Sequence, residues 1–434
     1  MNLNPGQCYI KSITITDSTG SKVLSKENGF LEYVHSIDIY ESIFTPYILA
    51  DLFLLDGSSL KERFNFSGNE DFTIEFLGYG NDQSLSYSMK LVEVKAQLVS
   101  NNLRSKTIAI RLASKELLTN SSQKIAKSYT SSSKDIIQDI LTNTLLTDKP
   151  LTAENTKSLP VTVIPFMSPF EGIDFIRKRS VSDQFLSSAF LFFENKNGYY
   201  FTTAESIIKN KNIFNGIVEV PTYFQKEDVS SNIKDSPTAV SDSKSHFLFA
   251  NYTVNTPINV NHLLSDGGLN TEISQYDFTT KVYSKRLFRN TPNSKIFTEL
   301  TDGKNTILTD SISNDYSSGR RKPMLLPFAT YRDSENKTNN FLYDSLPERV
   351  CFSNLFTQQR TYIDIPGNTK LLAGSIINLE VPRHDSMELP NNRNEIESGY
   401  YIVSSIKHSI SITEDSKFSS HLELMRHGRG VFEQ

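Results

Sequence analysis

The clearest pattern in the first quarter of the chain is an alternation of apolar and polar residues. Phe72, Ile74 and Phe76, for example, alternate with polar neighbours. Similar alternation is found at 31–39, at 92–98 (with Val92 on the apolar face) and at 107–112. A period of two predicts antiparallel strands that each bury one face. Turn residues at 56–57, 67–69 and 78–82 separate these strands, a spacing typical of a β-barrel or sandwich.

Helical periodicity replaces this alternation beyond residue 115. Apolar residues between 136 and 145 fall on one helical face, behind a serine run at 131–133. A second helix is predicted to begin at Ser168, because Pro169 follows it and Glu171 stands three residues on. Serine, proline and glutamate at this spacing form a capping box, which satisfies the free N–H groups of a first helical turn.

A hairpin is predicted after the second helix. Its strands are 189–193 and 199–203, and the Asn197-Gly198 pair between them can supply residues with positive φ. The region 115–215 is therefore interpreted as a mixed α/β module.

The rest of the chain alternates between polar segments and further strands. Residues 229–245 contain almost no apolar side chains and predict a loop, and 260–345 predict an irregular insertion with a few strands. Alternation returns between 360 and 426. The predicted divisions are a first β domain at 1–114, the mixed module at 115–215, a second β domain at 216–259 and 346–434, and the insertion at 260–345. The fold class expected is α+β and rich in β-structure.

Composition and charge narrow the function classes. The chain has 434 residues, of which 38% are hydrophobic and 22% charged, with a net charge of −4. This is the composition of a globular protein with several domains. No long run of Lys or Arg occurs. A protein that binds duplex DNA tightly needs such a basic surface to displace counterions from phosphate, so this class is disfavoured.

Export and membrane anchoring are not predicted. The N-terminal segment lacks a basic start and an apolar core of signal-peptide length. The most apolar stretches, 47–55 and 189–193, are too short for a membrane span. Two cysteines, Cys8 and Cys351, are expected to be free structural thiols in a protein made in a reducing cytosol.

Catalytic and metal-binding patterns were sought among the titratable residues. The seven histidines are His35, His246, His262, His384, His408, His421 and His427. None shows the paired spacing that places two imidazoles on one helical face to bind zinc. His35 and His408 are expected to be half-buried on apolar strand faces, and the His421–Glu423 pair to be exposed surface.

Other candidate chemistry is equally sparse. No nucleophile elbow, Walker loop or dinucleotide fingerprint occurs. Arg177, Lys178 and Arg179 most simply complement the C-terminal dipole of the capped helix, with phosphate binding as the alternative. A glycosidase carboxylate pair leaves no sequence signature and stays open. No catalytic, cofactor-binding or metal-binding residue is therefore predicted, and no enzyme.

A family resemblance is carried by these segments, in chain order: 34–44, 50–56, 67–74, 164–176, 275–283, 373–379, 399–408 and 421–426. They resemble the baseplate hub subunits of contractile-tailed bacteriophages, a family related to the hub portion of type VI secretion spike proteins. Each is mainly a strand pattern, and the specificity lies in their order.

The resemblance implies a fold and a set of partners. It implies two similar tube-forming, antiparallel β-barrel-like domains per subunit and a homotrimer, so that three chains form a pseudo-sixfold ring. The implied partners are the tail tube protein, a separate spike protein and other baseplate proteins, with DNA passing through the ring without specific binding. The implied location is the tail baseplate of the virion, assembled in the host cytoplasm. Segments 34–44 and 50–56 are the predicted contact with the tube.

Three alternatives stay open at this stage. A tail-associated cell-wall hydrolase would be an enzyme. The hub of a secretion system or of a tail-like bacteriocin would share the architecture and lack the DNA. A receptor-binding tail fibre would be a sugar-binding β protein, although fibres usually carry repeats that are absent here.

Overall fold

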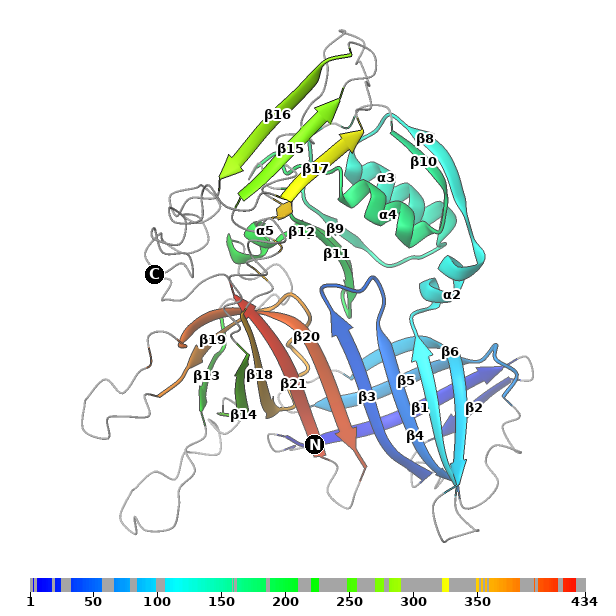
Figure 1. Cartoon of the computed structure of the whole chain (residues 1–434). Coiled ribbons are helices and arrows are strands. Elements are labelled where there is room, and N and C mark those ends of the chain that lie inside the picture. Colours follow the sequence, from blue (N-terminus) through cyan, green and yellow to red (C-terminus); the bar gives the residue numbers. More distant parts are fainter. Residues whose placement is uncertain are drawn as a thin grey trace.

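The structure of the chain is a computed structural model. Figure 1 shows two β-rich units side by side, with a mixed module above them. The described residues are 3, 6–17, 20–24, 33–56, 66–78, 84–98, 106–157, 159, 162–184, 188–209, 220–225, 248–255, 270–276, 281–289, 322–327, 349–350, 353, 356, 359–382, 394, 397–412 and 417–426.

The first β unit is an antiparallel sheet of seven strands. They are β1 (Cys8–Asp17), β2 (Gly20–Leu24), β3 (Val34–Ser42), β4 (Leu49–Asp56), β5 (Asp71–Gly78), β6 (Leu85–Leu98) and β7 (Lys106–Ala113). Their order is β3-β4-β7-β6-β5-β1-β2. Phe72, Ile74 and Phe76 are fully buried on its inner face. The predicted antiparallel sheet with one buried side is confirmed here.

The second β unit is a closed barrel of six strands. They are β13 (Thr222–Gln225), β14 (Leu248–Asn255), β18 (Gln359–Pro366), β19 (Ile376–Glu380), β20 (Gly399–Ser411) and β21 (Lys417–Arg426). The order β19-β13-β14-β18-β21-β20 closes because β19 also pairs with β20. β13 runs parallel to both of its neighbours, whereas the other pairs are antiparallel. Closure removes the free strand edges that would otherwise invite aggregation.

The β20–β21 hairpin belongs to both units. β20 pairs with β3 from Ser405 to Ser411, which joins all the strands above into one sheet of 13 strands. Ile410 and Phe418 of this hairpin pack in the core of the first unit. The N–H of Phe418 also donates to the carbonyl of Gly6 just before β1, at 2.7 Å. The first unit is therefore completed by strands from the C-terminal end of the chain.

Two bulges shift the phase of the alternation and overturn two expectations. In β3, Val34 pairs with Leu54 and Ser36 with Phe53, so His35 has no partner position and is exposed. In β6, Val92 is the extra residue between two paired positions, and it is 42% exposed. Because a bulge inserts one residue into one strand, the side chains beyond it change face. The expectation of a half-buried His35 and an inward Val92 was wrong for this reason.

The mixed module combines short helices with two small sheets. Its helices are α2 (Lys115–Ser122), α3 (Ser133–Asp139), the π-helical turn η2 (Ile140–Thr144), α4 (Pro169–Arg177) and α5 (Ala204–Lys209). Its strands are β8 (Ile125–Tyr129), β9 (Leu151–Ala153), β10 (Thr162–Met167), β11 (Phe190–Asn195) and β12 (Gly198–Thr203). α3 and η2 together form the predicted helix over 136–145, and their apolar face packs against α4 and the β11–β12 sheet.

Two local predictions in this module are confirmed. The carboxylate of Glu171 accepts hydrogen bonds from the backbone N–H and the hydroxyl of Ser168, at 2.8 and 2.7 Å. The capping box therefore starts α4. The hairpin also forms, with a turn of two residues, because Asn195 pairs with Gly198. Gly198 has φ +131°, and a Cβ there would clash with the carbonyl oxygen of Pro150.

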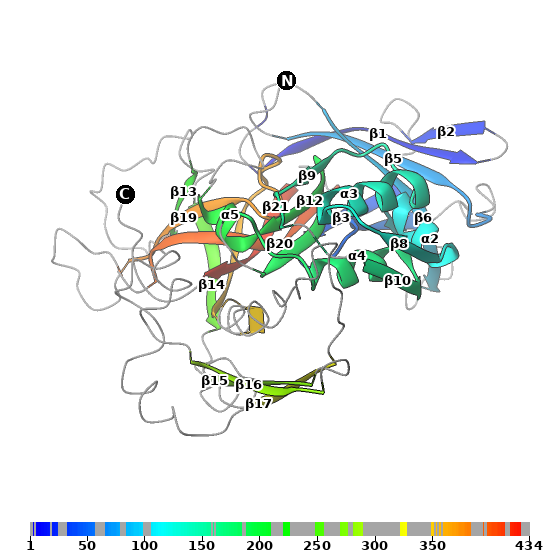
Figure 2. The same ribbon diagram turned by 90° about the horizontal axis from the view of Figure 1, so that it is seen from above.

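A separate three-stranded sheet lies within the region predicted as an insertion. It consists of β15 (Asn270–Tyr276), β16 (Tyr283–Arg289) and β17 (Lys322–Pro327), in the order β16-β15-β17. Figure 2 shows it to one side of the two β units. Taken together, the chain has a β-rich α+β fold with a closed barrel of six strands and smaller sheets. The expected β-rich α+β class is confirmed. The expectation that both β domains are antiparallel was wrong for the second, because β13 pairs parallel with β14 and β19.

Candidate functional surface

A groove of about 620 Å³ lies on the outer face of the long sheet, where the two β units meet. Its walls come from β3, β4 and β7 of the first unit and from β18, β20 and β21 of the barrel. The inward residues of the same strands fill the two cores. The groove is therefore formed by the polar face of one continuous sheet.

The first charged pair in the groove joins β4 to β7. Arg111 holds Asp51 with two parallel hydrogen bonds, from Nε at 2.8 Å and from a terminal nitrogen at 3.1 Å. These bonds and the charge of Asp51 raise the pKa of Arg111. Bidentate geometry of this kind fixes both side chains on the sheet surface.

The second pair joins β3 to β20. Lys407 lies 2.9 Å from Asp38, which also accepts a hydrogen bond of 2.6 Å from the hydroxyl of Ser409. The ammonium group of Lys407 lies 5.6 Å from the centre of the Tyr40 ring. Burial alone would lower the pKa of Lys407, but the hydrogen bond and charge of Asp38 outweigh it and raise this pKa.

Two further pairs join β18 to β21. His421 hydrogen-bonds Asp364 through Nδ1 and lies 3.2 Å from the Ser419 hydroxyl through Nε2. Arg360 lies 3.0 Å from Glu423. Each basic residue that lines the groove, namely Arg111, Lys407 and His421, is therefore matched by a carboxylate on the next strand.

The predicted His421–Glu423 surface pair is thus split between two partners. The two side chains lie on the same face of β21, but His421 contacts Asp364 and Glu423 contacts Arg360. His421 is partly exposed, as expected.

The remaining candidate residues fall into two groups. Those outside the described residues are His246, His262, His384, His427 and Cys351. Cys8 is free and buried, and burial raises its thiol pKa to about 12.

His408 lies deeper than the sequence suggested. It is 1% exposed, its Nδ1 lies 2.9 Å from the Ser420 hydroxyl, and its ring packs on Phe418. The expected half-burial was wrong because the Phe418 ring packs against the imidazole and the backbone at Leu371 lies within hydrogen-bond reach of it. Burial lowers the pKa of His408 from 6.5 to about 4.

This shift predicts a pH dependence of stability. In the unfolded chain His408 becomes protonated below about pH 6.5, whereas in the folded protein it becomes protonated only below about pH 4. The contribution of His408 is therefore complete above pH 6.5 and falls by about 1.4 kcal/mol per pH unit toward pH 4. We expect His408→Gln to reduce the loss of unfolding free energy between pH 7 and 5 by about 2 kcal/mol relative to wild type. Urea denaturation at both pH values measures this; equal losses in the two proteins would contradict it.

The basic residues at the end of α4, Arg177 to Arg179, contact other residues of the mixed module. Arg177 and Lys178 both contact Asp174, and Arg177 also donates to the carbonyl of Phe190 at 2.8 Å. Arg179 donates to the carbonyl of Phe175 in the last helical turn at 2.9 Å. These contacts fit the predicted complement to the C-terminal dipole of the helix.

Metal and membrane sites were also sought in the described part of the chain. There, no group of three or more His, Cys, Asp and Glu side chains is arranged to hold a metal ion. In the same residues, no helix combines the length and hydrophobicity that crossing a membrane requires.

A second pocket of about 350 Å³ lies beside Glu154, whose carboxylate accepts from the N–H and hydroxyl of Thr203 at 2.9 and 2.8 Å.

Comparison with solved structures assigns the fold. A tail protein from Neisseria meningitidis MC58 aligns with a TM-score of 0.55 and 8% identity, over 96% of this chain and 97% of that one. The 43 kDa tail protein of prophage MuSo2 from Shewanella oneidensis aligns with a TM-score of 0.51 and 10% identity, over 96% and 98%. This chain has the fold of phage tail proteins.

The tail-protein fold extends over nearly the whole chain, as the resemblance predicted. A weaker similarity, with a TM-score of 0.45 and 11% identity, is to a chain of the Francisella PdpA–VgrG complex; it covers all of this chain and 55% of that one. By sequence, no protein-family model and no curated protein matches. The likeness therefore lies in the path of the backbone and not in shared residues.

The paired charges of the groove were missed at the sequence level. The sequence offered one signal for these pairs: charged residues at polar positions of predicted strands, namely Asp38, Asp51 and Arg111. Their partners depend on strand order and register, since Asp38 meets Ser409, 371 residues away.

Proposed function

We propose that the chain is a structural, non-catalytic baseplate hub subunit of a contractile phage tail. In this proposal three copies form a ring that joins the tail tube to a separate spike protein and lets DNA pass. The supporting observation is the fusion of two β units through the shared β20–β21 hairpin. Three such chains would present six β units to a hexameric tube and three equivalent faces to a trimeric spike.

The two β units are proposed to act as equivalents despite different strand connections. The first is antiparallel, and the second contains two parallel pairings. Equivalence in a ring requires similar outer dimensions and a continuous wall, and the unbroken sheet from β5 to β18 supplies such a wall. The proposed domains remain 1–114, 115–215, 216–259 with 346–434, and 260–345.

The groove supports passage of DNA. Its basic residues are already paired with carboxylates, so few free cations are offered to phosphate. A wall with unpaired arginines would hold a polyanion by counterion release and retard it. We therefore propose that this face of the sheet belongs to the channel.

The oligomeric state tests the proposal directly. Light scattering of the purified chain, alone and with the tube and spike proteins encoded beside it, should give a hub component of three times 49.1 kDa. Electron microscopy should show a ring with six lobes. A chain that is monomeric in all these mixtures would overturn the proposal.

The contact with the tube is proposed at the β3–β4 turn. Phe44 in this turn is 47% exposed although its neighbour Ile43 is buried. We expect Phe44→Glu to weaken binding to the tube protein at least tenfold, because aromatic anchors dominate protein interfaces. Phe166→Glu, at a residue 77% exposed on the mixed module, is the matched control and should bind as wild type does. Equal affinities for all three proteins, measured by calorimetry, would place the contact elsewhere.

A further inference from the structure

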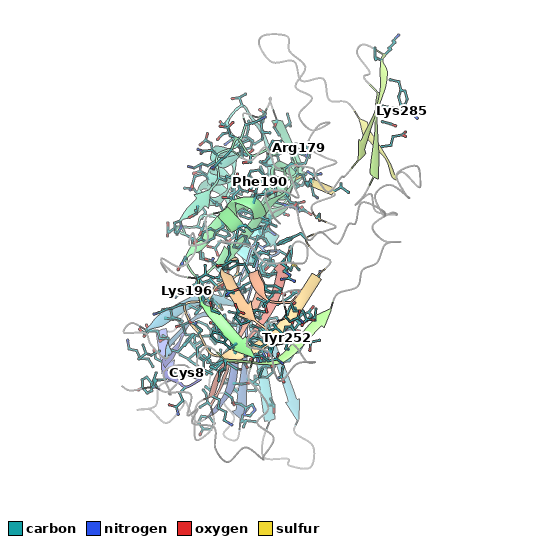
Figure 3. All side chains as sticks on the ribbon, turned by 90° about the vertical axis from the view of Figure 1, so that its left-hand side faces the viewer. Cys8, Arg179, Phe190, Lys196, Tyr252 and Lys285 are labelled. Carbon is teal, nitrogen blue, oxygen red and sulfur yellow. The ribbon has the colours of Figure 1, made fainter. Side chains whose placement is uncertain are left out.

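The tip of the β11–β12 hairpin reaches between the two β units. The N–H of Lys196 donates to Oε1 of Glu41 on β3 at 3.0 Å. The side-chain amide of Asn195 donates to the carbonyl of Ala373, just before β19, at 3.3 Å. Figure 3 shows Lys196 between Cys8 of the first β unit and Phe190 of the mixed module. The tip of one hairpin therefore touches both β units and itself belongs to the mixed module.

Glu41 is the group on which these contacts converge. Its side chain is 1% exposed, and its carboxylate accepts from three separate elements. The donors are the N–H of Lys196, the N–H of Ala373 at 3.2 Å and the hydroxyl of Tyr87 at 3.4 Å. A carboxyl group with donors from the hairpin, the barrel and the first sheet fixes the three relative to one another.

The surroundings of Glu41 disfavour its charged form. Burial is the largest cause that raises the pKa of this carboxyl, and the charge of Glu194 acts in the same direction; the two backbone N–H groups and Lys196 oppose them. The net effect is a rise from 4.5 to about 7. The Lys196 ammonium group donates to the carbonyl of Ser86 and lies 4.6 Å from the centre of the Tyr87 ring. Burial lowers the pKa of Lys196, opposed by Glu41.

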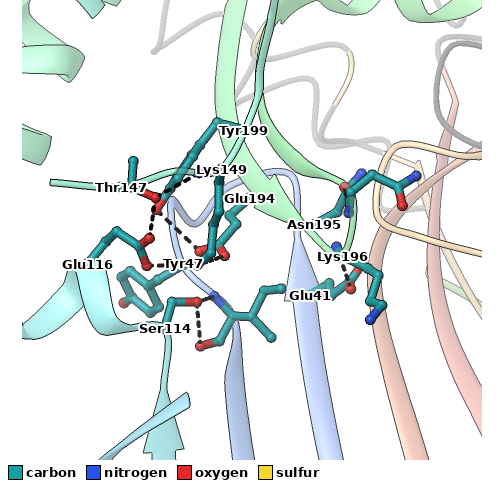
Figure 4. A network of polar contacts seen from close by, with 12 residues as sticks. Glu41, Tyr47, Ser114, Glu116, Thr147, Lys149, Glu194, Asn195, Lys196 and Tyr199 are labelled. Carbon is teal, nitrogen blue, oxygen red and sulfur yellow. Dashed lines mark hydrogen bonds and ion pairs between the residues drawn. The ribbon is translucent and has the colours of Figure 1, made fainter. Parts of the chain in front are cut away.

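The nearest other charged groups at this junction form ion pairs with one another. Figure 4 shows Glu194 and Glu116 on either side of Lys149, a short distance from Glu41. Glu194 and Glu116 lie 2.6 and 2.7 Å from the Lys149 ammonium group. Burial raises the pKa of both Tyr87 and Tyr200, so these phenols stay neutral near pH 7. Burial also raises the pKa of Glu194, but that carboxylate is paired with Lys149, whereas the donors to Glu41 are two backbone N–H groups and a phenol.

We propose that the tip of the β11–β12 hairpin is a proton-dependent latch that fixes the mixed module against both β units, and that Glu41 carries the proton. The folded junction binds this proton more tightly than the opened one, because opening returns the carboxyl group to water. Acid therefore tightens the latch. Between pH 4.5 and about 7 the opened state loses the proton first, so the latch loosens as pH rises, and above about 7 it loosens no further.

Hydrogen exchange of the full chain, followed by mass spectrometry from pH 5 to 8, tests the latch. After correction for intrinsic exchange rates, protection of the peptide that contains Lys196 should fall about tenfold per pH unit up to pH 7 and then level off. Peptides from β15, which belongs to the separate three-stranded sheet, should show no such step. A hairpin tip with the same protection at pH 5 and pH 8 would overturn the proposal.

Variants separate Glu41 from other buried carboxylates. Glu41→Gln should abolish the pH step, because the amide cannot ionise. Glu70→Gln is the matched control: Glu70 is equally buried in the first unit but accepts from Ser67 and Gly68, and the step should persist. Tyr87→Phe removes one donor to Glu41 and should move the levelling-off point above pH 7, a readout that survives if Glu41→Gln fails to fold. Two results would contradict the assignment to Glu41. One is a pH step that persists in Glu41→Gln, and the other is a levelling-off point that stays at pH 7 in Tyr87→Phe.

Discussion

Replacing Phe418 by alanine is expected to lower the free energy of unfolding by about 3–5 kcal/mol. Phe418 is 2% exposed and stands on the hairpin that the two β units share. Its ring meets Phe76 edge-on at 5.9 Å and His408 at 5.6 Å. The backbone cannot close over the cavity, because the N–H and carbonyl of Phe418 are bonded to Gly6 and Gly367.

Gly367 offers a complementary test at the same place. A Cβ built on Gly367 would overlap the Phe418 ring. Gly367→Ala should therefore displace the ring and destabilise the protein by about 1–3 kcal/mol or more, as overpacking does. Phe224→Ala, at a residue 51% exposed on β13, is the control and should stay within about 0.5 kcal/mol of wild type. Urea denaturation of the three variants measures these differences. A Phe418→Ala protein as stable as the control would show that the shared hairpin does not hold the units together.

The sequence predicted helix starts and strand faces correctly where these depend on neighbouring residues alone. The capping box at Ser168 and the alternation at Phe72–Phe76 each depend on residues within a few positions. Such predictions failed at His35 and Val92, because a bulge adds one residue without any mark in the apolar pattern. Alternation extrapolated across a bulge places every later side chain on the wrong face.

The closed barrel and the groove could not be predicted from such patterns. Closure depends on β13 pairing with β19, whose residues lie more than 150 positions apart. The ion pair between Asp38 and Lys407 requires the register of β3 against β20, which no local pattern contains. The resemblance predicted the tail-protein fold, but not the parallel pairings of β13 that close the second barrel.

Removing the charge of Lys149 is the second change with a large expected effect. Its ammonium group lies between Glu116 and Glu194, which are 5% and 1% exposed. Burial alone would lower the pKa of Lys149, but the two carboxylates outweigh it and raise this pKa. The carboxylates respond differently: the attraction of Lys149 lowers the pKa of Glu116 against its burial, whereas the deeper burial of Glu194 raises the pKa of that group.

We expect Lys149→Met to lower the free energy of unfolding by about 3 kcal/mol at pH 7. Methionine keeps the apolar stem but leaves two buried carboxylates without a cation, a change that typically costs about 3–5 kcal/mol. The lower end applies because the Lys149 side chain is 32% exposed and water screens part of the charge. In the variant both carboxyls gain a folded-state pKa above that of the unfolded chain. The loss should therefore shrink as the pH falls toward 4.5.

Matched variants separate this burial effect from a simple loss of charge. Lys127→Met breaks an exposed pair with Asp139, in which Lys127 is 54% exposed, and should lose less than about 1 kcal/mol. Combining Lys149→Met with Glu116→Gln and Glu194→Gln should recover most of the stability, since no unpaired charge then stays buried. Urea denaturation at pH 7 and pH 5 gives all of these values. If Lys149→Met costs no more than Lys127→Met, the buried triad does not contribute to the stability of the protein as proposed.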